Sequence, residues 1–182
     1  MCHFITAVLP ASAPIDALDA IAREHGRAFT PLANASITEQ LGAGIRYFAT
    51  SSACDCGTPL GAALRTGRGR RAPDAETQRE RMRKQGWSAA KIERAMAQRN
   101  DRLGEKQAAA QAQEQLAVDD WLGFLRAILA SRATPTIGLL LHFYDGPLSA
   151  RIDLEGREAV SRDALTAERL AQVREDVLYV FG

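Results

Sequence analysis

Residues 134–147 read TPTIGLLLHFYDGP and contain a long apolar segment. Its apolar run is nearly continuous and stops at an Asp-Gly-Pro turn signal, a pattern typical of a strand buried on both faces. The run is far shorter than the roughly 18 apolar residues that a membrane-spanning helix needs. A strand of this kind lies in the middle of a sheet, so we expect the other segments to be arranged around it.

Further strands are expected on both sides of this run. HFITAVL at 3–9, GIRYFATSS at 44–52 and VLYVF at 177–181 are rich in β-branched and aromatic residues. RAFTPL at 27–32 is predicted to be an edge strand, because its proline cannot donate to an inner ladder. ARIDL at 150–154 is expected to add a short strand.

Helical patterns separate these strands. PIDALDAIAREHG at 14–26 places its apolar residues on one helical face. In SITEQLG, Ser36 and Glu39 have the spacing of a capping box, which predicts one or two helical turns. Thr166 is expected to cap AERLAQVRED at 167–176.

A longer helical stretch begins at about residue 74. It is predicted in pieces that are separated at Gly86 and again near residue 100. Ser88 caps the second piece, with Trp87 and Ile92 at the positions of a hydrophobic staple. The last piece, at about 105–131, is strongly amphipathic in its second half.

Together these elements predict an α+β fold with a mostly antiparallel sheet of four to six strands. The first and last helices are expected on one face, with a long helical insertion set into the chain. The short connections around the first helix resemble a ferredoxin-like half, an analogy of fold that carries no function. We expect a single domain over 1–182, containing a basic loop and helical insertion over 65–131.

The net charge of +1 conceals an uneven distribution. Residues 65–106 carry 13 Lys and Arg against 6 Asp and Glu, a net of +7, and the remaining residues carry a net of −6. A basic segment is therefore set into an acidic protein. Hydrophobic content of 46% and charged content of 25% are ordinary for a globular chain, which excludes overall disorder.

The N-terminal sequence MCHFITAVLPASAPID has no basic region before its short apolar run, so it does not resemble a secretory signal. We therefore expect a cytoplasmic protein that does not associate with membranes. Three cysteines in such a chain favour reduced thiols over a disulfide framework.

Cys54 and Cys56, in SSACDCGTPLG at 51–61, have the spacing at which two side chains of an extended segment point to the same side. Three interpretations are open: core packing of small apolar residues, half of a zinc site, or a redox-active pair. Zinc takes about four ligands, and Cys2, His3 and His142 are the candidates to complete the set. The cofactor expected is therefore either none or zinc.

Catalysis has one weak candidate, Cys2. If Met1 is removed, Cys2 becomes the N-terminal residue, as in N-terminal nucleophile hydrolases, where the α-amine acts as base. Those enzymes have two stacked sheets, and the sequence offers five or six strand segments. A cysteine- or zinc-dependent hydrolase that uses Cys2, Cys54 or Cys56 is one alternative function. The sequence contains no G-x-S-x-G elbow and no phosphate-binding glycine loop.

The leading interpretation is a non-catalytic protein-binding or regulatory module, of an inhibitor, immunity or adaptor type, that uses its helical arm and basic loop. A second alternative is a nucleic-acid-binding module, because the arginines of RTGRGRR at 65–71 would attract phosphate. A protein partner is preferred over nucleic acid, since aromatic residues are scarce there and the pI is about 7.8. The candidate partner-binding residues are Arg68, Arg70, Arg71, Arg79, Arg83 and Trp87.

Overall fold

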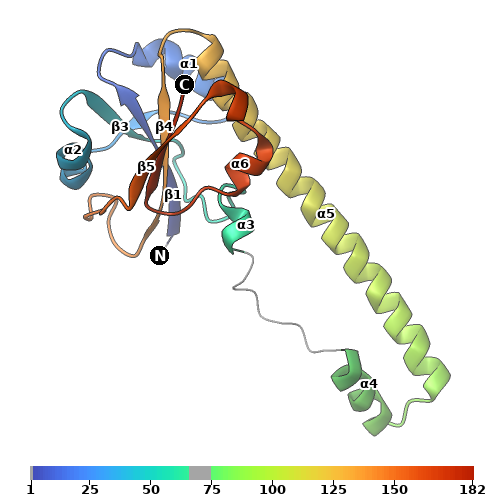
Figure 1. The fold of residues 1–182 in the computed structure, drawn as a ribbon. Helices are drawn as coiled ribbons and strands as arrows, with labels where there is room; N and C mark the ends of the chain where they lie inside the picture. The colour runs from blue at the N-terminus through green and yellow to red at the C-terminus, as the bar shows by residue number, and fades with distance from the viewer. Residues whose placement is uncertain (1, 66–74) are drawn as a thin grey trace. The chain divides into compact units, whose positions relative to one another are not determined.

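The computed structural model describes residues 2–65 and 75–182, apart from the side chains of residues 65, 107, 110 and 111 (Figure 1). Within these ranges, no helix combines the length and the apolar character needed to cross a membrane. The elements, in chain order, are β1 (Cys2–Pro10), α1 (Ile15–Glu24), β2 (Thr30–Pro31), α2 (Ala35–Leu41), β3 (Ile45–Ala49), α3 (Ala62–Arg65), α4 (Ala75–Lys84), α5 (Ala89–Ala130), β4 (Ile137–Tyr144), β5 (Gly156–Val160), the 3-10 helix η2 (Arg162–Ala164), α6 (Ala167–Ala171) and β6 (Val177–Phe181).

The predicted α+β class is confirmed. The six strands form one sheet in the order β2-β3-β1-β4-β6-β5. Every pair is antiparallel except β5 with β6. β4 lies inside the sheet between β1 and β6, as its apolar run predicted. The proline-containing β2 lies at an edge, where a residue without an N–H costs no ladder bond.

The connections differ from a ferredoxin-like half. β1 pairs directly and antiparallel with β3, so α1 does not form a parallel crossover there. The parallel crossover lies instead in the C-terminal part of the chain, where α6 connects β5 to its neighbour β6. The resemblance therefore stops at the presence of helices on an antiparallel sheet.

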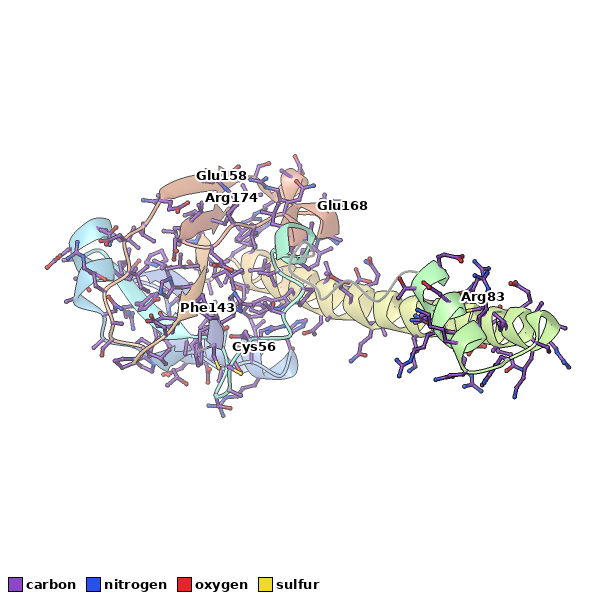
Figure 2. The ribbon with its side chains drawn as sticks, turned by 90° about the horizontal axis from the view of Figure 1, so that it is seen from below. Cys56, Arg83, Phe143, Glu158, Glu168 and Arg174 are labelled. Atoms are coloured by element: carbon purple, nitrogen blue, oxygen red, sulfur yellow. The ribbon has the colours of Figure 1, made fainter. Side chains whose placement is uncertain are left out.

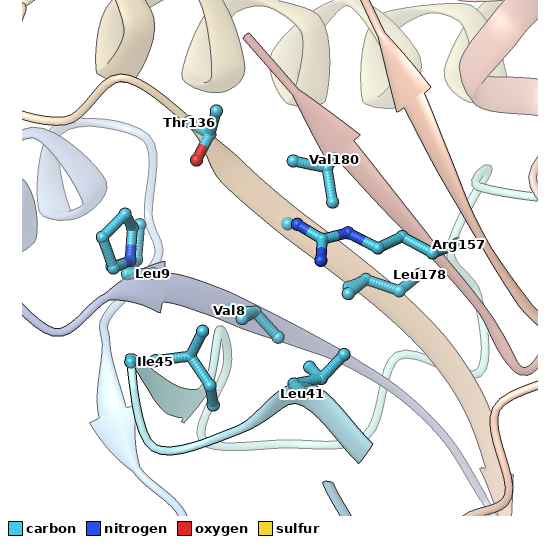
Figure 3. Close-up of a pocket in the computed structure, with 11 residues that line it drawn as sticks. Val8, Leu9, Leu41, Ile45, Thr136, Arg157, Leu178 and Val180 are labelled. Atoms are coloured by element: carbon cyan, nitrogen blue, oxygen red, sulfur yellow. The ribbon is translucent and has the colours of Figure 1, made fainter. Parts of the chain in front are cut away.

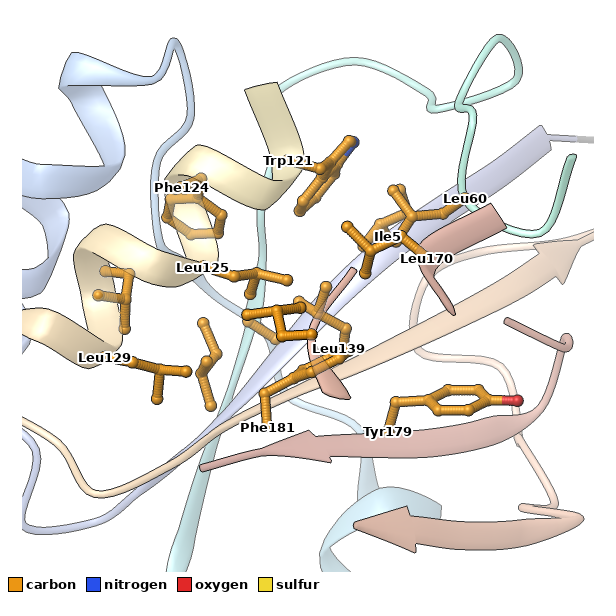
Figure 4. Packing of buried hydrophobic residues seen from close by; sticks show 14 of the residues in the cluster. Ile5, Leu60, Trp121, Phe124, Leu125, Leu129, Leu139, Leu170, Tyr179 and Phe181 are labelled. Carbon is orange, nitrogen blue, oxygen red and sulfur yellow. The ribbon is translucent and has the colours of Figure 1, made fainter. Parts of the chain in front are cut away.

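One face of the sheet, called here the main face, packs against α1, residues 116–130 of α5, and α6 (Figure 1). Figure 4 shows large apolar side chains of α5 above the strands, and all of them are at most 3% exposed. This apolar stripe is the amphipathic half of the predicted last helical piece. The buried residues that meet on this face include Ile5, Trp121, Phe124, Leu125, Leu129, Leu139, Leu170 and Phe181.

The opposite face, called here the second face, carries a smaller core. Val8, Tyr47, Leu140 and Leu178 lie on its strands, and Ile37 of α2 packs over them. The loop after β4 adds buried apolar residues to the same cluster. The sheet is therefore covered on both faces, by helices on the main face and by α2 and a loop on the second.

Three local predictions were wrong. ARIDL does not form a strand; the strand is Gly156–Val160, which pairs with β6. α5 is one continuous helix, since the Ala-, Glu- and Gln-rich residues around Gly104 have enough helix propensity to offset the roughly 1 kcal/mol cost of one glycine. The cap of α2 is Asn34 in place of Ser36, because the Asn34 side chain accepts the N–H of Ile37.

The chain divides into two compact units, one of residues 1–65 and 116–182 and one of residues 66–115. The second unit contains α4 and the first part of α5. The ion pair of Arg79 and Glu93 joins these two helices, and Ile92 and Met96 are buried in the described part of this unit. Trp87 lies under the Lys91 ammonium at 4.1 Å from the ring centroid.

Candidate metal-binding site

The three cysteines of the chain lie together. Cys2 is the first residue of β1, and Cys54 and Cys56 belong to the loop that follows β3. One sulfur from each residue lies within 4.8 Å of the other two. Cys2 is half-buried, whereas Cys54 and Cys56 are exposed (Cys56 is labelled in Figure 2). The interpretation of Cys54 and Cys56 as core packing is therefore wrong.

The loop that carries Cys54 and Cys56 is anchored at both ends. At its start, the Thr50 hydroxyl donates to the carbonyl of Ile5 at 2.7 Å. At its end, the Gly61 N–H donates to the carbonyl of Leu170 at 3.1 Å. These buried anchors fix where the loop leaves and rejoins the main face, so the sulfurs project from a constrained segment.

Asp55, between the two loop cysteines, holds them beside β1. Its N–H donates to the carbonyl of His3 at 2.7 Å, and its Oδ2 accepts the N–H of Ile5 at 2.8 Å. Burial raises the pKa of Asp55, while the Ile5 N–H and the charge of Arg27 oppose that rise. These two hydrogen bonds fix the register of the loop against the start of β1, which brings Cys54 and Cys56 to Cys2.

The thiols of Cys2 and Cys54 differ in pKa. The pKa of Cys54 is lowered, first by the backbone N–H of Cys56 and then by the thiols of Cys56 and Cys2. The pKa of Cys2 is raised, mainly because its thiol interacts with those of Cys56 and Cys54. Of these two thiols, Cys54 therefore ionises more readily, and metal ligation needs the thiolate form.

His3 and His142, the other predicted ligands, pair with carboxylates. His3 Nε2 lies 2.8 Å from Glu175 Oε1, and His142 Nδ1 is hydrogen-bonded to Asp176. Across the described residues, the group close enough to hold one ion consists of the three cysteines. Alternation along β1 explains the separation of His3, because neighbours on a strand point to opposite faces.

The spacing of the sulfurs suits a thiophilic metal. Zinc–sulfur bonds of about 2.3 Å in tetrahedral geometry place sulfurs about 3.8 Å apart. Sulfurs within 4.8 Å of one another reach that separation through movements of an ångström or less. Three thiolates leave the fourth tetrahedral position for another ligand.

The predicted partner-binding arginines are described in part. Arg68, Arg70 and Arg71 fall outside the described residues. The Arg79 guanidinium lies 3.3 Å from Glu93, and Arg83 pairs with Glu76 at 3.2 Å. Arg79 therefore links α4 to α5, whereas Arg83 is exposed.

Comparison with known proteins gives no match: no family model, no curated protein and no solved structure matches this chain. The functional argument therefore depends on the residues of this chain. The cysteine cluster is the group of side chains whose arrangement points most directly to a chemistry.

Proposed function

We propose that this chain is a non-catalytic regulatory protein that binds a zinc ion through the thiolates of Cys2, Cys54 and Cys56. The observation that carries the proposal is the convergence of the three sulfurs within 4.8 Å, from two segments about fifty residues apart in sequence. Thiolates are soft ligands, and they favour zinc over magnesium or calcium, which take oxygen ligands.

The position of the cluster favours reversible binding over a structural role. Both loop cysteines are exposed, and the buried residues of the main face form a core without them. A structural zinc usually substitutes for a core that is too small, as in zinc fingers. Here the metal would bind to a fold that is already packed, so its occupancy can follow the metal supply.

Metal binding should depend on pH in a defined direction. The metal displaces the thiol protons, so affinity rises with pH until the thiols are ionised. Cys54, with its lowered pKa, is expected to ionise before Cys2, whose pKa is raised. Of these two residues, Cys54 is therefore expected to contact the metal first.

The test is a metal titration of the full chain, purified under reducing conditions and stripped with a chelator. Zinc affinity is measured by competition with a chromophoric chelator, and cobalt substitution reports sulfur ligation through its thiolate charge-transfer band. We expect one metal per chain and at least tenfold weaker binding for Cys54→Ser. Substoichiometric metal, or unchanged affinity in Cys54→Ser, would overturn the proposal.

His3→Gln and His142→Gln are the matched variants for the fourth ligand. If a histidine leaves its carboxylate partner to join the metal, that variant loses affinity together with the cysteine variants. If both bind as the wild type does, the fourth position belongs to solvent or to a partner. A metal-dependent ester hydrolysis lost in Cys54→Ser would support the hydrolase alternative, because that position would then hold the attacking water.

A second candidate function is binding of an acidic protein partner through the unit of residues 66–115. The observation that favours it is α4, which has no buried side chain and carries Arg81, Arg83 and Lys84 in its last turn. A helix that buries nothing gains its stability from ion pairs and from what it binds.

Charge reversal tests this second function. The double variant Arg81→Glu and Arg83→Glu should weaken association with an acidic partner, while Arg151→Glu, in the other unit, should leave it unchanged. Binding that survives the double variant would remove α4 from the interface. A loss of affinity with salt as steep as that of phosphate contacts, measured with an oligonucleotide, would favour nucleic acid instead.

A further inference from the structure

The second face of the sheet has a hollow that α2 and the loop after β4 leave uncovered. The hollow encloses about 120 Å³ and is partly open to solvent; Figure 3 draws the residues that line it. Aliphatic residues dominate its wall, and it contains neither an aromatic nor an acidic side chain. Its lining residues are Val8, Leu9, Pro10, Leu41, Gly44, Ile45, Thr136, Gly138, Arg157, Leu178 and Val180.

Gly138 on β4 lines the hollow at a crowded point of the backbone. A Cβ at this position would lie 3.0 Å from the Leu178 side chain and 3.2 Å from Cβ of Val8, closer than most contacts allow. The side chains of Leu178 and Val8 therefore occupy the space that a larger residue here would need. α2 ends at Leu41, on the wall of the hollow, so the helix does not extend across it.

Arg157 brings a positive charge to this apolar surface. It lies on β5, and Figure 3 shows its side chain extended across the Leu178 and Val180 side chains toward the centre of the hollow. Among the described residues, no carboxylate forms an ion pair with Arg157, whereas Arg151 and Arg169 are both paired. Thr136 adds a hydroxyl to the same wall.

We propose that the hollow binds a small carboxylic acid with a short aliphatic body, whose carboxylate pairs with Arg157 while its chain packs against the aliphatic wall. A guanidinium recognises a carboxylate through two parallel N–H bonds, and the wall offers no competing negative charge. A cavity of about 150 Å³ accommodates the six carbons of benzene, so a hollow of about 120 Å³ takes about five non-hydrogen atoms, and the rest of a longer acid lies toward its opening.

This site is separate from the cysteine cluster. The hollow is lined by Val8, Leu9 and Pro10 at one end of β1, whereas Cys2 lies at the other end. At about 3.3 Å per residue, the two sites are roughly 20 to 25 Å apart along the strand. Metal binding and acid binding can therefore be tested independently, and failure of one leaves the other standing.

The experiment is a titration of the full chain, labelled with ¹⁵N, with hexanoate, followed by amide chemical shifts. We expect saturable shifts confined to the lining residues, with a Kd at or below about 1 mM. Hexanamide, which has the same shape without the charge, and acetate, which lacks the aliphatic body, are both expected to bind more weakly.

Arg157→Gln is the decisive variant, and Arg162→Gln, an exposed arginine outside the lining, is its matched control. Both remove one positive charge from the same unit. We expect Arg157→Gln to weaken hexanoate binding by about three- to tenfold and Arg162→Gln to leave it unchanged. Because Arg157 is exposed, the variant should fold, and its melting temperature checks this.

Each alternative outcome overturns the proposal. If hexanoate bound equally well to the wild type and to Arg157→Gln, Arg157 would not contact the carboxylate. Amide shifts that do not saturate would show that hexanoate has no specific site in the hollow. Equal affinity for hexanamide would show that charge plays no part. Shifts of the same amides on increasing the protein concentration alone would make the hollow a contact between two copies of the chain.

Discussion

Replacing Asp55 by alanine tests how the cysteines are held together. The change removes the carboxylate oxygen that accepts the Ile5 N–H at 2.8 Å, and leaves that N–H without its partner. A hydrogen bond to a charged group contributes about 1.5–3 kcal/mol. Removing a partly buried carboxylate returns part of its desolvation cost. We therefore expect the free energy of unfolding to fall by about 1.5–2 kcal/mol, and zinc affinity to fall by about ten- to a hundredfold.

The assay is urea unfolding followed by tryptophan fluorescence, since Trp121 is buried in the main core and reports its loss. Asp145→Ala is the matched control, because Asp145 is exposed and the described structure gives it no hydrogen bond or ion pair; we expect a change within about 0.5 kcal/mol. Equal unfolding curves for Asp55→Ala and Asp145→Ala would refute the role of Asp55 as the tether. If Asp55→Ala lowered the free energy of unfolding but left zinc affinity unchanged, Asp55 would stabilise the fold without positioning the cysteines.

The remaining predictions concern the scaffold. Asn34→Ala should cost about 2–3 kcal/mol in urea unfolding, because the buried amide caps α2 and donates to two carbonyls of the loop after β4. Gly61→Ala should lower the free energy of unfolding by about 3 kcal/mol, since φ is +69° and the new Cβ would lie 2.5 Å from the Val173 carbonyl oxygen. Gly104→Ala is expected to raise the free energy of unfolding by about 0.5–1 kcal/mol, because the position on α5 has open space around it. The raised pKa of Asp55 means that the folded state retains a proton that the unfolded state has lost above about pH 3.9. The free energy of unfolding of the wild type, relative to that of Asp55→Asn, should therefore fall as pH rises from about 3.9 through the pKa of Asp55 in the folded state, and then level off. Urea unfolding at a series of pH values measures this difference.

The elements that sequence predicted well are those whose signals are local. The run around Leu140 identified β4 as an inner strand because burial on both faces leaves a continuous apolar pattern. β5 was missed because Gly156–Val160 contains two adjacent charged residues between small ones, and only Val160 is buried. Its pairing with β6 comes from the parallel crossover through α6, a long-range arrangement that no short pattern encodes.

The candidate site was predictable in part. The spacing of Cys54 and Cys56 indicated two sulfurs on one side, and Cys2 was among the residues expected to join them. Asp55 holds the two loop cysteines beside Cys2 through hydrogen bonds to the backbone of β1. The spacing of the cysteines in the sequence does not predict these hydrogen bonds. The alternation of side chains along β1 could have separated Cys2 from His3 before the structure was known.

The central position of β1 has a consequence for synthesis of the chain. Thr6 of β1 contacts Leu140 of β4, which lies 134 positions later in the chain, a distance that a ribosome covers in roughly 7 to 27 s at about 5 to 20 residues per second. During that interval one edge of β1 stays unpaired, and unpaired edges are prone to aggregate. The unit of residues 66–115 is translated within the same interval. The length of this unit therefore contributes to the time before β4 can pair with β1. In a chain shortened within that unit, β4 should pair with β1 sooner.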